Sequence, residues 1–169
     1  SLETKSPLVE GADLGCAYLG LDGLQSLYKS DMTLVKAVKE TISDTFTVQL
    51  GIAEGKFIAY LAALSSPPGG HRTLIGDACS FLKDLSCDVL PVSLESRQKL
   101  RDFGLHTLGQ VAALSREPLQ SQFGPEGRRI WELARGQDNT PLYPRRSEEV
   151  IEESAMLLSV TVSLEAILV

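Results

Sequence analysis

The 169-residue sequence is poor in cysteine, histidine and aromatic residues. Its three cysteines, Cys16, Cys79 and Cys87, are odd in number and show no Cys-x-x-Cys spacing, which argues against a disulfide framework or a zinc site. The two histidines, His71 and His106, lie far apart, so neither a metal site nor a Ser–His pair is expected. We interpret both as solvated loop residues.

Long apolar segments and targeting signals are also missing. The longest unbroken apolar runs cover only a few residues, which excludes a transmembrane helix, and no charged segment precedes an apolar one as in a signal peptide. No Gly-x-x-x-x-Gly-Lys-[Ser/Thr] loop for nucleotide phosphates occurs. With 43% apolar residues the chain can build a packed core, and we expect a cytoplasmic protein with no membrane partner. Because the sequence starts without Met, we expect a fragment or a processed product.

The net charge of −6 is distributed unevenly along the chain. Residues 1–94 carry 11 acidic and 7 basic residues, and residues 147–169 carry five acidic residues and no basic one. Residues 95–146 carry 6 acidic and 9 basic residues, a net charge of +3. The overall acidity argues against nucleic-acid binding, whereas the middle segment could present a local basic face.

Strand and helix patterns alternate over the first half of the chain, which predicts a mixed α/β unit. In chain order, the expected elements are a strand within 13–24, a helix capped by Asp31, a strand at 46–52, a helix at 53–64, a strand at 73–75 and a helix capped by Asp77.

The pattern changes near 86–92, where we place a domain boundary. Four short helices are predicted at 93–102, 107–114, 116–122 and 125–135. Their expected starting residues are the N-caps Ser93, Thr107 and Ser115 and the first-turn residue Pro125. Trp131 has apolar neighbours and is expected in the core. Turn residues at 136–150 predict a linker, and the tail predicts a strand at 156–162 and a helix start at 164–169.

The segment from Phe103 to Gly109 is typical of a tight turn between two helices. Gly104 permits a positive φ after the first helix, Leu105 would pack inward, and Thr107 would cap the next helix. Backbone N–H groups at such a turn can bind DNA phosphates, although an ordinary corner between helices has the same spacing. The candidate DNA-binding residues are Gly104, Leu105, His106, Thr107 and Gly109 in the turn and Lys99, Arg101, Arg116, Arg128, Arg129 and Arg135 around it.

Three stretches carry motifs that occur together in a known family. Residues 14–23 read Leu-Gly-Cys-Ala-Tyr-Leu-Gly-Leu-Asp-Gly, and residues 51–62 read Gly-Ile-Ala-Glu-Gly-Lys-Phe-Ile-Ala-Tyr-Leu-Ala. The third stretch contains the elements Lys99-Leu100, Phe103-Gly104-Leu105, Thr107-Leu108-Gly109, Phe123-Gly124, Leu133-Ala134-Arg135-Gly136 and Pro141-Leu142. Together they resemble the Y-family DNA polymerases of the DinB/UmuC type, and more closely their catalysis-deficient ImuB-like relatives.

The resemblance implies an α+β fold that is part of a polymerase. Residues 1–90 would be the C-terminal half of a palm, a mixed β-sheet with helices on one face. Residues 91–136 would be a small all-α thumb with helix-hairpin-helix-like packing, and residues 137–169 would be a linker and the start of a little-finger domain. The fingers and the first palm strand would precede residue 1.

Departures from the family pattern bear on catalysis. Active members carry an Asp-Glu pair where this chain has Gly15 and Cys16, and neither residue can hold Mg²⁺ for two-metal nucleotidyl transfer. We therefore expect no metal ligand and no cofactor, with Mg²⁺ bound only if catalysis is retained. In a strand, Asp13 would share a face with Gly15, which leaves a rescue by Asp13 open. The family's triphosphate-binding lysine corresponds to Lys56, the nucleotide-binding candidate, and the family's Gly-hydrophobic-Gly turn before the thumb is replaced at 89–93.

The resemblance implies a non-catalytic, polymerase-like protein of DNA repair and damage-induced (SOS) mutagenesis, in the bacterial cytoplasm and associated with the nucleoid. It would hold the backbone of primer–template DNA without sequence preference, and its partners would be a catalytic polymerase and a sliding clamp. Two alternatives stay open: an active translesion polymerase with rearranged carboxylates, and a protein-interaction scaffold whose helical module no longer touches DNA.

Overall fold

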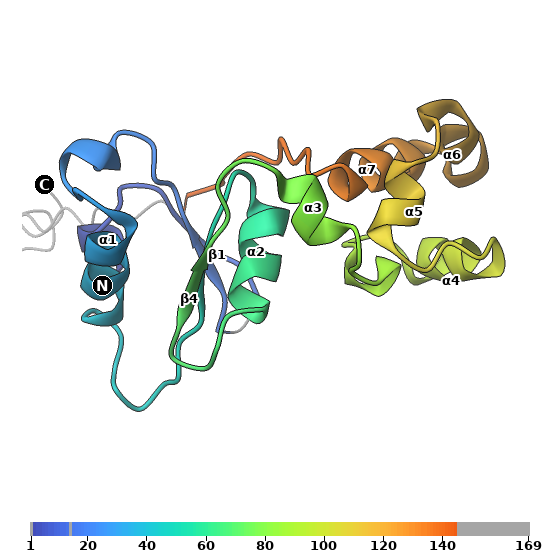
Figure 1. Cartoon of the computed structure of the whole chain (residues 1–169). Helices are drawn as coiled ribbons and strands as arrows, with labels where there is room; N and C mark the ends of the chain where they lie inside the picture. Colours follow the sequence, from blue (N-terminus) through green and yellow to red (C-terminus); the bar gives the residue numbers. More distant parts are fainter. Residues whose placement is uncertain (1, 14, 145–169) are drawn as a thin grey trace, which may run out of the picture.

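The computed structural model describes residues 2–13 and 15–144, which form two lobes (Figure 1). The sheet lobe, residues 2–82, contains 3₁₀ turns at Leu2–Thr4 and Leu24–Ser26 and the elements β1 (Val9–Gly11), β2 (Ala17–Leu19), α1 (Asp31–Lys39), β3 (Leu50–Ile52), α2 (Lys56–Leu64), β4 (His71–Thr73) and α3 (Ala78–Leu82). The helical lobe, residues 87–134, contains a 3₁₀ turn at Cys87–Val89 and the helices α4 (Leu94–Asp102), α5 (Leu108–Ala112), α6 (Arg116–Phe123) and α7 (Pro125–Ala134). After α7 the chain returns to the sheet lobe (Figure 1).

The strands pair two by two within the described residues. β1 and β2 are antiparallel, with Val9 opposite Leu19, whereas β3 and β4 are parallel, with Leu50 opposite His71. Both strand orientations occur, as predicted, but in two separate small sheets. α2 connects β3 to β4 and packs against both strands.

Gly51 allows α2 to pack directly onto β3. A Cβ atom at this position would lie 1.9 Å from the carbonyl oxygen of Ala59 and 2.5 Å from the amide nitrogen of Ala63. Because both neighbours are backbone atoms of α2, a side chain here would push the helix away from the strand. The glycine therefore fixes the distance between the two elements that carry the candidate site.

Several predicted strand boundaries are wrong. The paired segments are shorter than the predicted strands. Only Ala17–Leu19 and Leu50–Ile52 pair, each with a partner strand of three residues, β1 and β4 respectively. β1 was not predicted, because its Val-Glu-Gly sequence is too short to show a strand period. β4 begins two residues earlier than predicted, so His71 lies half-buried in a strand and not in a solvated loop.

Helix starts were predicted more successfully. Asp77 and Ser93 cap α3 and α4 as expected, and Thr107 forms a capping box with Gln110 at the start of α5. Ser115 precedes α6 without a side-chain hydrogen bond to the helix. The predicted cap of α1 is wrong, because Ser30, with extended backbone, accepts from the Thr33 amide at 3.3 Å, and Asp31 is already helical.

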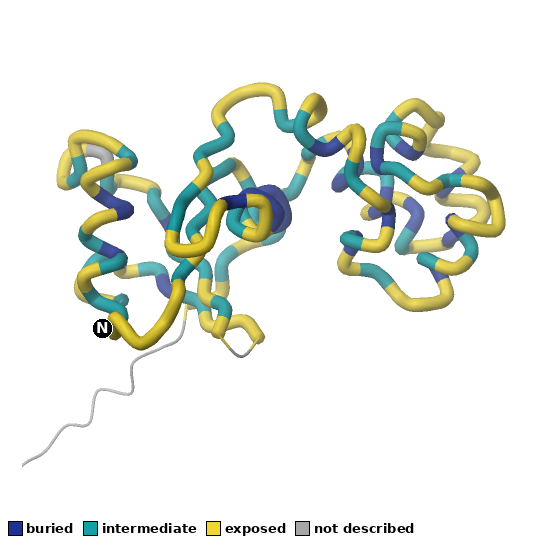
Figure 2. The backbone as a smooth tube through the Cα atoms, turned by 60° about the horizontal axis from the view of Figure 1, so that its bottom comes forward, coloured by how far each residue is buried: buried dark blue, intermediate teal, exposed yellow. Residues whose placement is uncertain are grey.

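One apolar cluster runs through the helical lobe and into α2. Leu100, Leu108 and Ile130 have no exposed surface, and Leu82 links them to Ile58. Buried positions follow this path in Figure 2.

Two further predictions concern single elements. Trp131 lies half-buried at the edge of the cluster, where its Nε1 donates to the carbonyl of Leu114 at 2.9 Å. The predicted strand at 156–162 and helix start at 164–169 lie outside the described residues. No helix among residues 2–13 and 15–144 has the length and apolar character needed to cross a membrane.

Candidate functional site

Lys56, the predicted nucleotide-binding residue, begins α2 and is enclosed by the chain itself. Its Nζ donates to Glu10 Oε2 at 2.5 Å, and the two side chains are only 13% and 18% exposed. The rings of Tyr18 and Tyr143 flank the ammonium group, with centroids 5.6 and 5.4 Å from Nζ. The charge of Lys56 is therefore neutralised within the sheet lobe.

Glu10 receives a second hydrogen bond at the same oxygen. The amide of Tyr143 donates to Glu10 Oε2 at 2.7 Å. The hydrogen bond from Lys56, and then that from the Tyr143 amide, lower the pKa of the Glu10 carboxyl. At neutral pH the side chain is a carboxylate that holds both β1 and the segment after α7 against Lys56.

Asp138 occupies the N-terminus of α2 from outside the helix. Gly55, at the N-cap, has a φ of 87° and no side chain to cap with, and Asp138 Oδ2 accepts from the Phe57 amide at 2.7 Å. Burial alone would raise the pKa of Asp138, but hydrogen bonds from Thr140 and the Phe57 amide outweigh it and the pKa is lowered. A carboxylate therefore satisfies the first turn of α2.

Gly15 and Cys16 lie in the connection between β1 and β2. The Cys16 amide donates to the carbonyl of Asp13 at 2.8 Å, and Gly15 has a φ of 82°. The prediction that Asp13 and Gly15 share a strand face is therefore wrong, because both lie in a turn.

The neighbouring titratable groups are also poor metal ligands. Burial, followed by the charge of Asp13, raises the pKa of the Cys16 thiol, and burial raises the pKa of Tyr18 to about 12. Both groups stay protonated at neutral pH. The residues that the structure describes contain no cluster of three or more His, Cys, Asp or Glu side chains able to hold a metal ion.

The turn between α4 and α5 has the predicted backbone shape. Gly104 adopts a φ of 73°, Leu105 packs against the apolar cluster, and Thr107 caps α5. His106 is exposed, as predicted. These features fit a tight corner between two helices.

The amides of this turn are nevertheless hydrogen-bonded inside the molecule. Leu108 N donates to Leu85 O at 2.9 Å and Gly109 N donates to Lys83 O at 3.0 Å. The amides of His106 and Thr107 both donate to the side chain of Gln110. Gly104 N and Leu105 N bond to carbonyls at the end of α4. A phosphate could use these donors only by displacing internal acceptors, so phosphate contact would depend on side chains instead.

The predicted cations of the helical lobe divide into two groups. Four are engaged within the lobe: Lys99 with the Gln122 carbonyl and the Phe123 ring, Arg101 with Asp88, Arg128 with Glu132, and Arg135 over the Trp131 ring. Arg116 in α6 and Arg129 in α7 are exposed and have no ion pair or side-chain hydrogen bond to any described residue, although the charge of Arg129 helps to lower the pKa of Glu126 and of Asp138. These two guanidinium groups are the best placed to contact an external phosphate.

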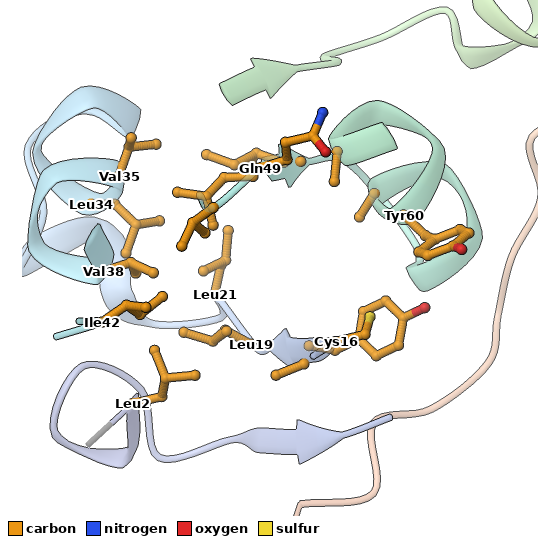
Figure 3. A pocket seen from close by; sticks show the side chains of 18 of the residues that line it. Leu2, Cys16, Leu19, Leu21, Leu34, Val35, Val38, Ile42, Gln49 and Tyr60 are labelled. Carbon is orange, nitrogen blue, oxygen red and sulfur yellow. The ribbon is translucent and has the colours of Figure 1, made fainter. Parts of the chain in front are cut away.

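An apolar cavity of about 440 Å³ separates the two small sheets (Figure 3). Leu19 and Leu21 reach it from one side and Leu34, Val38 and Ile42 from the other. β2 and β3 both line it, and within the described residues each pairs with only one other strand.

Sequence reasoning missed Glu10, Asp138 and Tyr143. Glu10 meets Lys56 across 46 residues of sequence, Asp138 meets Phe57 across 81, and Tyr143 meets Glu10 across 133. No local pattern could have indicated these contacts.

No family model matches the chain. Its sequence is 30% identical over 154 residues to DNA polymerase IV of Dehalococcoides mccartyi strain CBDB1, covering 88% of this chain and 40% of the relative. It is also 30% identical over 155 residues to DNA polymerase IV of Caulobacter vibrioides, covering 89% of this chain and 38% of the relative. The chain thus spans about 40% of the length of these relatives.

Solved structures show the same arrangement of elements. The crystal structure of DinB from Sulfolobus solfataricus matches with a TM-score of 0.65 at 20% identity, over 85% of this chain and 44% of that one. The insertion ternary complex of Dbh DNA polymerase matches with a TM-score of 0.68 at 22% identity, over 83% and 43%. The chain therefore has the α+β fold of a partial polymerase palm and thumb, as predicted. In sequence the chain is similar to part of DNA polymerase IV.

Proposed function

We propose that the chain is the palm–thumb portion of a non-catalytic, ImuB-like protein of DNA repair and SOS mutagenesis. It would hold the backbone of primer–template DNA and act with a catalytic polymerase and a sliding clamp, near the nucleoid of a bacterial cytoplasm. The observation that carries the proposal is Gly15-Cys16 at the position of the family's Asp-Glu pair. The same two residues lie in the connection between β1 and β2, the strands that carry Glu10 and Tyr18 beside Lys56.

The residues at this position do not fit a pair of Mg²⁺ ions. A two-metal site needs carboxylates that bridge both ions, and Gly15 has no side chain while Cys16 carries a protonated thiol. The nearby Glu10 carboxylate already binds Lys56 and the Tyr143 amide. Asp13 is exposed in the same turn and is the acidic residue on which the alternative, an active translesion polymerase, depends.

Primer extension separates the catalytic from the non-catalytic proposal. We expect no extension by the full-length protein with Mg²⁺ or Mn²⁺. Robust extension that is abolished by Asp13→Ala would overturn the non-catalytic assignment and support the active polymerase.

DNA contact is supported by the likeness to DNA polymerase IV and by the net charge of +3 over residues 95–146. Because the turn amides are used internally, we assign the phosphate contacts to Arg116 and Arg129 first. Each contact should add about −0.9 to the slope of log K against log salt concentration. The slope should be the same for primer–template duplexes of unrelated sequence, because phosphate contacts carry no base information.

The test is a salt titration of binding by the wild-type chain and single variants. Arg116→Gln and Arg129→Gln should each weaken binding and reduce the slope by about 1. Lys36→Gln is the matched control, since Lys36 is an exposed cation of the sheet lobe, 3.9 Å from Glu40. A flat salt response of the wild-type chain would overturn DNA contact.

A protein-interaction scaffold is the second candidate function. Internal hydrogen bonding of every amide from Gly104 to Gly109 favours it, because the helical corner then offers no ready phosphate clamp. Binding of a protein partner without DNA and with no salt dependence would support the scaffold.

We further propose that the first palm strand, which the family resemblance places before residue 1, lies in the cavity between β2 and β3. The apolar lining and the position between two small sheets support this placement. A longer chain that includes this strand should melt at a higher temperature and protect the Gly51 amide from hydrogen exchange. Unchanged exchange at Gly51 in that longer chain would contradict the placement.

A further inference from the structure

Residues 137–143, called the strap here, lie across the sheet lobe after α7 (Figure 1). At one end Asp138 bonds to the first turn of α2, and at the other end the Tyr143 amide bonds to Glu10. Between these two ends, Leu142 lies next to Gly20, the residue that follows β2. A Cβ atom at Gly20 would lie 3.1 Å from Leu142 Cδ1.

The two polar ends of the strap meet at adjacent residues of α2. Asp138 Oδ2 accepts from Phe57 N at 2.7 Å, and Glu10 Oε2 bonds to both Lys56 Nζ and Tyr143 N. We call these bonds the Asp138 latch and the Glu10 latch. Because Lys56 and Phe57 are neighbours in one helical turn, a movement of that turn disturbs both latches.

Packing at the Asp138 end ties the latches more closely together. A Cβ atom at Gly55 would lie 2.8 Å from Asp138 Cβ and 2.9 Å from its carbonyl oxygen, so the strap backbone touches the residue before Lys56. At the other end the Tyr143 ring covers Lys56 Nζ. The strap and the turn Gly55–Phe57 thus form one continuous contact surface.

We infer that the two latches open and close together, so that the strap is a conformational device that sets where the chain leaves the molecule. With both latches closed, the chain departs after residue 144 beside β1. With both open, the seven strap residues are tethered only at α7 and can reach roughly 23–25 Å from it. This inference does not depend on DNA binding.

Amide hydrogen exchange by NMR tests the coupling, read at Phe57 and Tyr143 in variants that remove one carboxylate at a time. Glu10→Ala removes the acceptor of Tyr143 and leaves that of Phe57, whereas Asp138→Ala does the reverse. We expect each variant to raise exchange at both amides by at least about tenfold, the loss expected for a hydrogen bond to a charged group.

The matched control is Glu40→Ala, which removes an exposed carboxylate that pairs with a lysine in the same lobe. It should leave both amides unchanged. The amide of Leu61, further along α2, should also keep its exchange rate in all variants, because its partners lie within the helix.

Independent latches would overturn the inference: Glu10→Ala would then change Tyr143 alone, and Asp138→Ala would change Phe57 alone. An equal rise at Leu61 would indicate general unfolding and would overturn it as well. If Glu10→Ala does not fold, Tyr143→Pro removes the donor at an exposed position and is read at Phe57, with Tyr143→Phe as its control. No rise at Phe57 in Tyr143→Pro would contradict the coupling.

Discussion

The two lobes are stabilised by different means. In the helical lobe, short capped helices close around a continuous apolar cluster, with residues such as Leu100 and Ile130 fully buried. In the sheet lobe, strands of three residues form two separate sheets with a cavity of about 440 Å³ between them. Short two-stranded pairs are marginal on their own, so this lobe depends on contacts made across long sequence separations. Helix caps and the packing of neighbouring helices therefore account for much of the helical lobe, whereas the sheet lobe needs contacts between residues far apart in the sequence.

The largest expected effect comes from truncating the core of the helical lobe. Leu100→Ala should lower the free energy of unfolding by about 3 kcal/mol, because a fully buried leucine leaves a cavity. Leu34→Ala in α1 should cost less, about 2 kcal/mol, because Leu34 is 8% exposed and lines the cavity. Urea unfolding followed by far-UV circular dichroism measures both values. Equal losses would show that α1 is packed as firmly as the helical core.

The second effect uses a glycine from each lobe. Gly51→Ala would place a Cβ atom 1.9 Å from Ala59 O, and Gly127→Ala would place one 2.2 Å from Leu119 O. Each should cost about 2 kcal/mol, since backbone must move to relieve the overlap. Fluorescence of Trp131, the single tryptophan, should follow the helical lobe and change mainly in Gly127→Ala.

Gly11→Ala is the control for this pair, because nothing lies within 4 Å of a Cβ atom at that position. It should leave stability nearly unchanged. A loss as large as that of Gly51→Ala would mean that the close approach of the α2 backbone to Gly51 does not explain the effect.

The contrast between the lobes also explains what could be predicted from sequence. The four helices after residue 90 and their starting residues were predicted, because caps such as Ser93 and Thr107 act within one turn, although Ser115 makes no side-chain hydrogen bond to α6. The positive φ of Gly104 follows from the same local logic. In the sheet lobe, by contrast, strand limits depend on a partner strand, and β1 escaped notice.

The candidate site was only partly predictable for the same reason. Lys56 was found from its motif, but its partner Glu10 is 46 residues away and Asp138 meets Phe57 across 81 residues. The amides of the α4–α5 turn were expected to point outward. The acceptors of the Leu108 and Gly109 amides, at Leu85 and Lys83, belong to another segment, which spacing within the turn could not indicate.

The third prediction compares two helix caps within the helical lobe. Thr107→Ala removes the hydrogen bond that the Thr107 hydroxyl accepts from the Gln110 amide and should cost about 1 kcal/mol. Ser115→Ala should cost no more than a few tenths of a kcal/mol, because the Ser115 side chain makes no cap hydrogen bond. Thermal unfolding of the two variants measures the difference. Equal costs would mean that Ser115 caps α6 in solution.

The smallest expected effect is the acid sensitivity of the strap. Hydrogen bonds from Lys56 and the Tyr143 amide lower the pKa of Glu10, so its contribution is fully present above the unfolded value, about 4.3, and is lost as pH falls through the lower folded value. Solvent near the exposed Tyr143 weakens the bonds, which keeps the effect small. Carbon-13 NMR of the Glu10 carboxyl should show a midpoint below that of an unfolded peptide.

The acid effect should appear in the sheet lobe before the helical lobe. The protection factor of the Tyr143 amide, which is the exchange rate corrected for the intrinsic effect of pH, should fall at pH values below the unfolded pKa of about 4.3, while the amide of Leu133, buried in α7, stays protected. In Glu10→Gln the protection factor at Tyr143 should depend less on pH, because the group that titrates has been removed. An unchanged pH dependence in Glu10→Gln would assign the acid response to Asp138, whose pKa is lowered as well, and would leave the Glu10 latch without a role in it.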